Sequence, residues 1–126
     1  MSSAHLDKLA RRAVACKRWR WMPGMLSNKG LRVTRCDRDG YVVGYYADLS
    51  YIAECVQGSL PDLTDPATFG CLLALVRKAW GQGVYLLPDA GWYVKGARLK
   101  SGDSIGLGIC ATSEAEALVA ALEAAQ

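Results

Sequence analysis

The sequence has few of the residues that usually build catalytic and metal sites. It contains one histidine, His5, and no pair of cysteines two residues apart. Zinc sites need clustered thiolates or imidazoles, and acid–base catalysis near neutral pH most often uses histidine. We could assemble no nucleophile, base and orienting group from the remaining residues. The sequence therefore predicts no metal, no cofactor and no enzymatic activity.

The cysteines do not form the pattern of a disulfide framework. Such frameworks normally pair an even number of cysteines in a short secreted chain. Here the number is odd, and neighbouring cysteines lie at least 16 residues apart: Cys16, Cys36, Cys55, Cys71 and Cys110. We expect reduced and mostly buried thiols that pack as small hydrophobic side chains.

Long hydrophobic runs are also missing. The longest apolar stretches fall far short of the roughly 20 residues that a membrane-spanning helix needs. The N-terminus carries charge by Asp7 and has no apolar segment of a secretory signal. With 126 residues the chain is long enough for one domain, residues 1–126. We expect a cytoplasmic protein with no membrane partner.

The charged residues are distributed unevenly along the chain. Residues 1–38 hold ten of the fifteen Lys and Arg residues and two acids, a net charge of +8. Residues 39–126 carry a net charge of −5. A basic segment of this kind is typical of a surface that meets an anionic partner. The candidate binding residues are Arg11, Arg12, Lys17, Arg18, Trp19, Arg20 and Trp21.

The segment 17–21 allows two interpretations. Indole rings can stack on bases while guanidinium groups meet phosphates, as in proteins that hold single-stranded nucleic acid. Alternatively, Trp19 and Trp21 share one side of an extended chain and belong to the core, with the arginines reaching outward. An acidic protein surface would suit the same basic segment.

Three segments have the apolar spacing of amphipathic helices: residues 3–18, 66–80 and 114–125. Asp65 precedes the second as an N-cap, and a proline follows it at the first helical position. Ser113 begins a capping box at the third helix. The second segment is the most apolar, so we expect it at the centre of the core.

The strand signals fall between these helices. Residues 31–36 and 41–46 predict a hairpin, residues 84–87 and 92–97 predict a second, and residues 104–111 predict a further strand. Residues 49–57 are ambiguous between a short helix capped by Asp48 and an extended segment. The pattern predicts an α+β fold with a largely antiparallel sheet of about five strands. N-terminal, central and C-terminal helices should pack on one face of that sheet.

The predicted strands are rich in aromatic residues: Tyr41, Tyr45, Tyr46, Tyr51, Tyr85, Trp92 and Tyr93. Side chains of a strand alternate between two faces, so half of these rings should point away from the core. Exposed Tyr and Trp are enriched at binding surfaces. The outer face of the sheet is a second candidate interface, for a partner protein or for a second copy of this chain, which would make a homodimer. Ordinary cross-strand aromatic packing is the alternative.

Two stretches, residues 19–25 (WRWMPGM) and residues 60–80 (LPDLTDPATFGCLLALVRKAW), resemble small uncharacterised proteins encoded by bacteriophages and prophages. They cover roughly a quarter of the chain. The resemblance implies a phage protein that acts in the cytoplasm of a bacterial host, and it implies no catalytic residue. Small phage proteins of this kind often bind a host protein or a defence complex.

The function that the sequence predicts is a non-enzymatic interaction protein of phage type that binds a host macromolecule. An inhibitor of a bacterial defence complex, such as an anti-CRISPR, belongs to this class. The alternative is a small nucleic-acid-binding protein that uses the basic N-terminal third and binds less tightly as salt rises. We expect a host protein or protein complex as the partner, with nucleic acid as the second candidate.

Overall fold

The protein is described here from a computed structural model of the 126-residue chain. The structure describes residues 3–36, 41–55, 58–81, 85–88, 92–95, 97–98, 104–105, 110–111 and 113–125.

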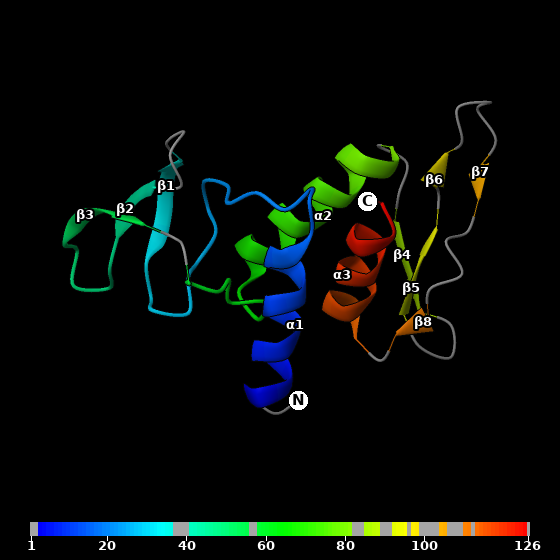
Figure 1. Ribbon diagram of the computed structural model, residues 1–126, viewed down its shortest axis with the longest axis horizontal. Coiled ribbons are helices and arrows are strands. Elements are labelled where there is room, and N and C mark those ends of the chain that lie inside the picture. Colours follow the sequence, from blue (N-terminus) through cyan, green and yellow to red (C-terminus); the bar gives the residue numbers. More distant parts are fainter. Residues whose placement is uncertain are drawn as a thin grey trace.

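Three helices form the middle of the molecule (Figure 1). They are α1 (Ser3–Ala15), α2 (Pro66–Trp80) and α3 (Glu114–Ala124). The three predicted helices are confirmed, although α1 ends at Ala15 and not at residue 18. The chain leaves the helix there through a tight turn, in which the Trp19 N–H donates to the Cys16 carbonyl.

Two helices begin with the caps that the sequence predicts. The Asp65 carboxylate accepts a hydrogen bond from the Thr68 N–H, and the Ser113 hydroxyl accepts one from the Glu116 N–H. The first N–H groups of a helix have no partner within the helix, so each cap accepts a hydrogen bond from an N–H that the helix leaves unpaired. Both helices therefore start where their caps place them.

The first sheet has three antiparallel strands in the order β1-β2-β3. They are β1 (Arg32–Cys36), β2 (Tyr41–Tyr45) and β3 (Tyr51–Cys55). The hairpin predicted from 31–36 and 41–46 is confirmed, while its turn lies outside the described residues. The segment 49–57, which the sequence leaves ambiguous, contains the extended strand β3, which pairs with β2 over its whole length. Its interpretation as a short helix is wrong.

The other strands form a second antiparallel sheet and a separate strand pair. The second sheet, in the order β4-β5-β8, contains β4 (Tyr85–Pro88), β5 (Trp92–Lys95) and β8 (Cys110–Ala111), and β6 (Ala97–Arg98) pairs with β7 (Ser104–Ile105). Where the sequence predicts one strand over residues 104–111, the structure has two short strands at the ends of this range, β7 and β8. Residues 106–109 between them lie outside the described part.

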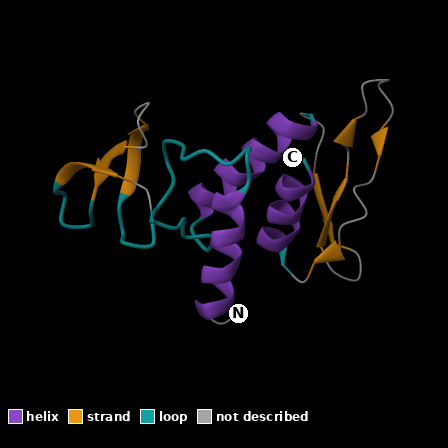
Figure 2. Ribbon diagram, viewed as in Figure 1, coloured by secondary structure: helices purple, strands orange, loops and turns teal. Residues whose placement is uncertain are grey.

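The fold is α+β, but the prediction of one sheet of about five strands is wrong. Two three-stranded sheets flank the helices, one on each side, so the helices do not share one face of a single sheet (Figure 2). The chain passes through α2 between β3 and β4, and the outer edge of β1 is hydrogen-bonded to residues 24–26.

The main core lies between the helices. Leu72 and Val76 of α2 and Leu118 and Leu122 of α3 are fully buried in it. The helix α3 contacts α1 and α2 and also β5 and β8 of the second sheet. Burying side chains of this size contributes roughly 1.5–3 kcal/mol each, so the α2–α3 contact is a major source of stability.

A smaller core lies under the first sheet. It consists of Leu31, Val33 and Val42, each with at most 2% of its surface exposed. Trp21 packs against this cluster and also against the helical core. The indole of Trp21 therefore joins the two apolar clusters of the molecule.

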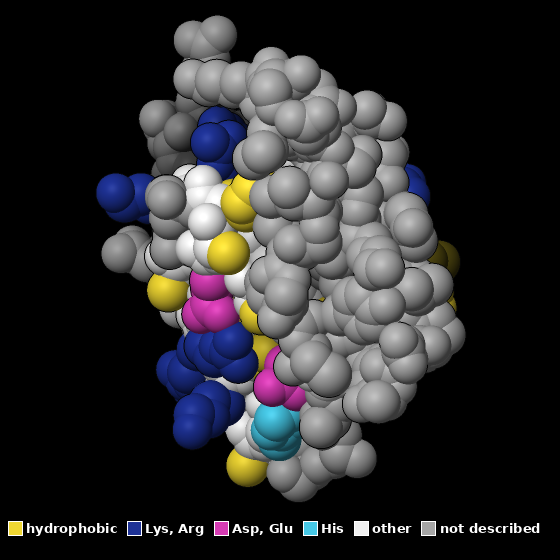
Figure 3. All heavy atoms as spheres, turned by 90° about the vertical axis from the view of Figure 1, so that its right-hand side faces the viewer, with side chains coloured by type: hydrophobic (Ala, Val, Ile, Leu, Met, Phe, Trp, Pro, Cys, Tyr) yellow, Lys and Arg dark blue, Asp and Glu magenta, His cyan; other side chains and the backbone are white. Residues whose placement is uncertain are grey.

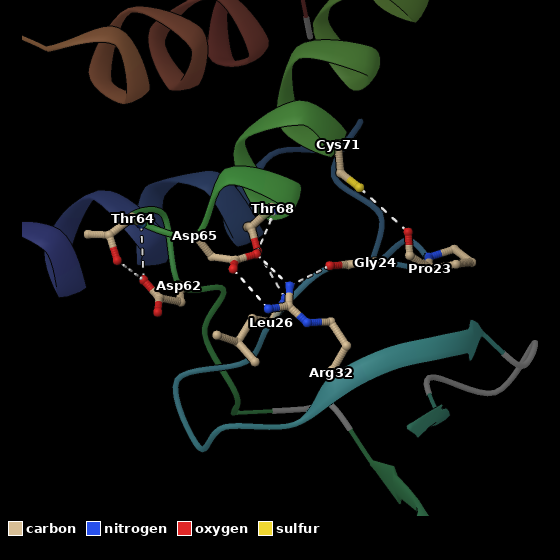
Figure 4. Close-up of polar contacts among 9 residues, drawn as sticks. All are labelled: Pro23, Gly24, Leu26, Arg32, Asp62, Thr64, Asp65, Thr68 and Cys71. Atoms are coloured by element: carbon tan, nitrogen blue, oxygen red, sulfur yellow. Dashed lines mark hydrogen bonds and ion pairs between the residues drawn. The ribbon is translucent and has the colours of Figure 1, made fainter. Parts of the chain in front are cut away.

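An ion pair joins the first sheet to the start of α2 (Figure 4). The Arg32 guanidinium donates to both carboxylate oxygens of Asp65, over 2.6 and 2.9 Å, and also to the Gly24 carbonyl. The Thr68 hydroxyl donates to the same carboxylate and accepts from the Leu26 N–H. Strand β1, the 24–26 segment and the start of α2 are thus held by one hydrogen-bonded cluster, the Arg32–Asp65 clamp.

Residues 28–60 leave the helical body and return to the same place. An isolated antiparallel bridge pairs Ser27 with Pro61. The Asn28 N–H donates to the Leu60 carbonyl, and the Asp62 N–H donates to the Leu26 carbonyl. The two ends of the first-sheet segment are therefore hydrogen-bonded to each other.

Removing the charge of Asp65 should weaken the fold. The Arg32 guanidinium lowers the Asp65 pKa from 3.8 to about 2. Because the folded-state pKa is the lower one, ionised Asp65 stabilises the folded state above pH 3.8, and this contribution is lost as the pH falls toward 2. Asp65→Asn should lower the free energy of unfolding at pH 7 by about 1–2 kcal/mol, measured in urea titrations. This loss is smaller than the pKa shift alone implies, because solvent screens the partly exposed guanidinium.

Asp62→Asn is the matched control, because Asp62 accepts from Thr64 and makes no ion pair among the described residues. The difference in stability between Asp65→Asn and the parent protein should shrink between pH 4 and pH 2. A pH-independent difference would contradict the ionic account of the clamp.

Glycine-to-alanine substitutions at two positions should have opposite effects. A Cβ atom on Gly44 would lie 2.1 Å from the Arg32 carbonyl oxygen, whereas one on Gly70 of α2 meets nothing within 4 Å. Gly44→Ala should cost about 2–3 kcal/mol of unfolding free energy, because β1 must move. Gly70→Ala should gain about 0.5–1 kcal/mol through helix propensity. Thermal unfolding of both variants checks this, and equal shifts would refute the close approach at Gly44.

Candidate functional site

The chain that follows α1 places its tryptophans and its arginines on different sides. Trp19 and Trp21 are half-buried and pack against the helical core, with their ring centroids 5.8 Å apart in an edge-to-face arrangement. Arg18 and Arg20 are exposed. Of the two interpretations of this segment, the geometry matches the one in which the indole rings belong to the core.

Three of the predicted binding residues line one pocket. Lys17, Arg18 and Arg20 meet Lys78 from the last turn of α2 around a hollow of about 340 Å³. We call this hollow the basic pocket. The other described residues of its lining are apolar: Leu75, Ala79 and Ala125. No acidic side chain of the described residues lines it, so an anionic group would enter a positive field beside an apolar wall.

Two hydrogen bonds join the segments that line the pocket to α3. The Arg18 Nε–H donates to the Ala125 carbonyl over 3.3 Å, which holds the guanidinium against the end of α3. The Trp80 Nε1–H donates to the Ala121 carbonyl over 2.9 Å, which ties the end of α2 to α3. The end of α2 and the segment after α1 therefore keep a fixed relation to the end of α3.

The other two candidate cations lie outside the pocket. Arg11 is exposed on α1. Arg12 donates to both carboxylate oxygens of Glu123 on α3, over 2.5 and 3.2 Å, and this hydrogen bonding raises its pKa. Arg12 thus joins α1 to α3, and its charge is matched within the fold.

The N-terminal excess of positive charge does not form one continuous surface. Besides Arg12, Arg32 pairs with Asp65, and the Lys29 Nζ lies 3.9 Å from a Glu54 carboxylate oxygen. Along one border of the face drawn in Figure 3, acidic side chains stand among the basic ones. The acids of residues 39–126 therefore pair with part of the basic third, while Lys17, Arg18 and Arg20 line the basic pocket.

Sequence reasoning missed Lys78 as a site residue. It lies about sixty positions after Arg20 in the chain, and its place in the last turn of α2 is explained by the helix dipole alone. Only the packing of the end of α2 against α3 brings its ammonium group to the pocket. No spacing within the sequence carries that information.

The pKa values of two of the three described thiols are shifted toward the unreactive form. Burial raises the pKa of Cys16 and of Cys71, which favours the unreactive thiol form. Cys36 is exposed, so the expectation of mostly buried thiols is wrong at this position. The side chains of Cys55 and Cys110 lie outside the described part of the chain. Within that part, no group of three or more His, Cys, Asp and Glu side chains is arranged to hold a metal ion.

A second hollow, of about 460 Å³, lies where the starts of α2 and α3 meet, and Leu63, Phe69 and Ser113 are among its lining residues. It lacks the charge of the basic pocket. The Asp65 and Ser113 caps already satisfy N–H groups at both helix starts, so we do not take it as the candidate site.

Comparison with known proteins found no matching protein family, no similar curated protein and no similar solved structure. Among the helices of the described residues, none has the length and apolar character that crossing a membrane requires.

Substitutions of Trp19 should separate packing from hydrogen bonding. The Trp19 Nε1 atom is buried and has no hydrogen-bond partner among the described residues. Trp19→Phe keeps a ring and removes an unsatisfied donor, so the free energy of unfolding should change by less than about 1 kcal/mol. Trp19→Ala leaves a cavity where the ring packs against the helical core and should cost roughly 2–4 kcal/mol.

Urea titrations of the two Trp19 variants give these values. A large and equal loss in both would mean that the indole N–H makes an essential hydrogen bond, contrary to the contacts described here.

Proposed function

We propose that this protein is a non-enzymatic binding protein that docks an acidic surface of another protein in its basic pocket. The observation that supports the proposal best is the convergence of Lys17, Arg18, Arg20 and Lys78 on one hollow with an apolar wall. An anionic group that enters this hollow lies near cationic side chains from two segments of the chain, and Coulomb attraction favours its binding there.

The shape of the pocket favours a protein partner over nucleic acid. Proteins that hold single strands combine a charged groove along the backbone with aromatic rings on which bases stack. Here the rings of Trp19 and Trp21 pack in the core, and neighbouring cations such as Arg12 are matched by acids. A compact pocket with Leu75 in its wall suits Asp or Glu side chains beside an apolar anchor.

Binding is also favoured over catalysis. An enzyme site needs a nucleophile, or an acid and a base, placed in a hollow with shifted pKa values. The basic pocket has only cations and aliphatic groups in its described lining. The described thiols with shifted pKa values, Cys16 and Cys71, are shifted toward the unreactive form.

The resemblance of residues 19–25 and 60–80 to phage and prophage proteins supplies the setting of the proposal. In that setting the partner is a host protein or protein complex in the bacterial cytoplasm. A host defence complex belongs to this class of partner. The resemblance touches the pocket directly, because both stretches contribute to it: Arg20 comes from the first, and Leu75, Lys78 and Ala79 come from the second.

A matched pair of double variants tests the pocket. Arg20→Gln/Lys78→Gln removes one arginine and one lysine from the pocket, and Lys8→Gln/Arg11→Gln removes one of each from the exposed side of α1. Both variants have the same net charge, so long-range attraction is the same in both. The probes are a fluorescent peptide rich in Glu and Leu, a single-stranded DNA and a duplex DNA, each measured by anisotropy at two salt concentrations.

The pocket variant should bind the acidic peptide about tenfold more weakly, because it loses charge-assisted hydrogen bonds. The α1 variant should change the affinity by less than about twofold, since exposed charges at a distance are screened. An equal loss in both variants would overturn the proposed site. Tighter binding of DNA than of the peptide, with a steep salt dependence, would favour the nucleic-acid alternative.

A further inference from the structure

The large hydrophobic side chains that the protein exposes are gathered in one place. In the described part of the chain, every exposed large hydrophobic residue lies between positions 41 and 52: Tyr41, Tyr45, Leu49, Tyr51 and Ile52. All belong to the hairpin of β2 and β3. Concentrated exposed apolar surface of this kind marks an interaction site more often than scattered residues do. We call this surface the β2–β3 patch.

The two edges of the first sheet differ in whether another segment is hydrogen-bonded to them. The outer edge of β1 is covered, because the Gly24 N–H donates to the Val33 carbonyl and the Val33 N–H donates to the Met25 carbonyl. Strand β1 also has an irregular register between Val33 and Arg35, a device that discourages further pairing. No described segment pairs with the outer edge of β3.

The sequence of β3 lacks the usual protection of an open edge. It contains no proline, lysine or arginine, and its register with β2 is regular throughout. Its one charged residue, Glu54, is turned toward its own sheet. The Glu54 carboxylate accepts a hydrogen bond from the Tyr46 hydroxyl over 2.5 Å. The same carboxylate lies 3.9 Å from the Lys29 Nζ, so the Glu54 charge is matched within its own copy. An edge whose N–H and C=O groups have no partner in the described part of the chain is a template for another strand.

We propose that the outer edge of β3 pairs antiparallel with β3 of a second copy of this chain, which joins the two first sheets into one continuous sheet of six strands. The two-fold axis lies at Ala53, the middle residue of the strand. Tyr51 then stands opposite Cys55 of the second copy, and Ile52 opposite Glu54 of the second copy. This register is the one that pairs all five residues of β3.

The register is self-complementary, which favours a second copy over a foreign strand. At the axis the two Ala53 residues meet, and alanine allows the backbones to approach. A register centred on Glu54 would bring two carboxylates together, and like charges directly opposite each other destabilise a strand pair. Centring the pair on Ala53 keeps the two Glu54 side chains apart.

The same register extends the aromatic row. Within one copy, Tyr45 stands opposite Tyr51, with ring centroids 4.5 Å apart, and Tyr41 stands opposite Cys55. In the joined sheet, Tyr41 of the second copy continues the row that Tyr45 and Tyr51 begin, on the same face. In this row Cys55 of the second copy lies between Tyr51 and the second copy's Tyr41, so the register aligns the aromatic rows of the two copies on one face without a direct tyrosine–tyrosine pair across the new strand pair.

Sedimentation velocity over a series of protein concentrations tests the proposal, together with amide hydrogen exchange of residues 51–55. The wild-type protein should shift from monomer to dimer as concentration rises, and amide protection in β3 should rise with it. Ala53→Lys places two ammonium groups together at the axis and should weaken the dimer at least about tenfold. Ala74→Lys, on the exposed side of α2, is the matched control and should leave dimerisation unchanged.

A protein that stays monomeric at the highest concentration would overturn the proposal. So would a dimer in which the β3 amides gain no protection, because another surface would then hold the copies together. A monomer whose β3 amides become protected only when an extended peptide is added would assign the edge to a foreign strand. The exchange data on the wild-type protein decide between these outcomes even if Ala53→Lys folds poorly.

Discussion

The Arg32–Asp65 clamp is the interaction on which the arrangement of this molecule depends. One carboxylate caps the most apolar helix, α2, and at the same time receives a guanidinium from β1. The hydrogen bonds that run on through Thr68 to the Leu26 N–H bind the incoming chain as well. The charge on Asp65 therefore couples the start of a helix to the position of a whole sheet, and its lowered pKa is the electrostatic sign of that coupling.

The basic pocket and the clamp lie at the two ends of one chain segment. The chain runs from the pocket at Arg18 and Arg20, through Trp21, to the clamp at Gly24, and Trp21 packs against both apolar clusters on the way. Arg18 and Arg20 are exposed, and the tryptophan that follows each of them in the chain packs against the helical core. The β2–β3 patch lies on the far side of the clamp, so the proposed docking site and the proposed dimer edge occupy separate surfaces.

The sequence predicts the parts of this fold that are set by local physics. The apolar period and the Asp65 and Ser113 caps place α2 and α3, and alternating residues place β1 and β2. The sequence does not predict which strands share a sheet, because strand pairing depends on contacts between segments far apart in the chain, such as that of β5 with β8. It places Lys17, Arg18 and Arg20 among the candidates, but not Lys78. It also does not reveal that Arg12 is matched by Glu123, since helix-to-helix contacts leave no periodic signal.

The bridge between Ser27 and Pro61 has an evolutionary consequence. A segment whose two ends already meet can change in length at its far loops with little effect on the rest, because loop-closure entropy grows slowly with length. Arg32 lies inside this segment and must stay in the clamp. Related chains could therefore carry a longer or shorter hairpin beyond Arg32 and still build the same helical bundle.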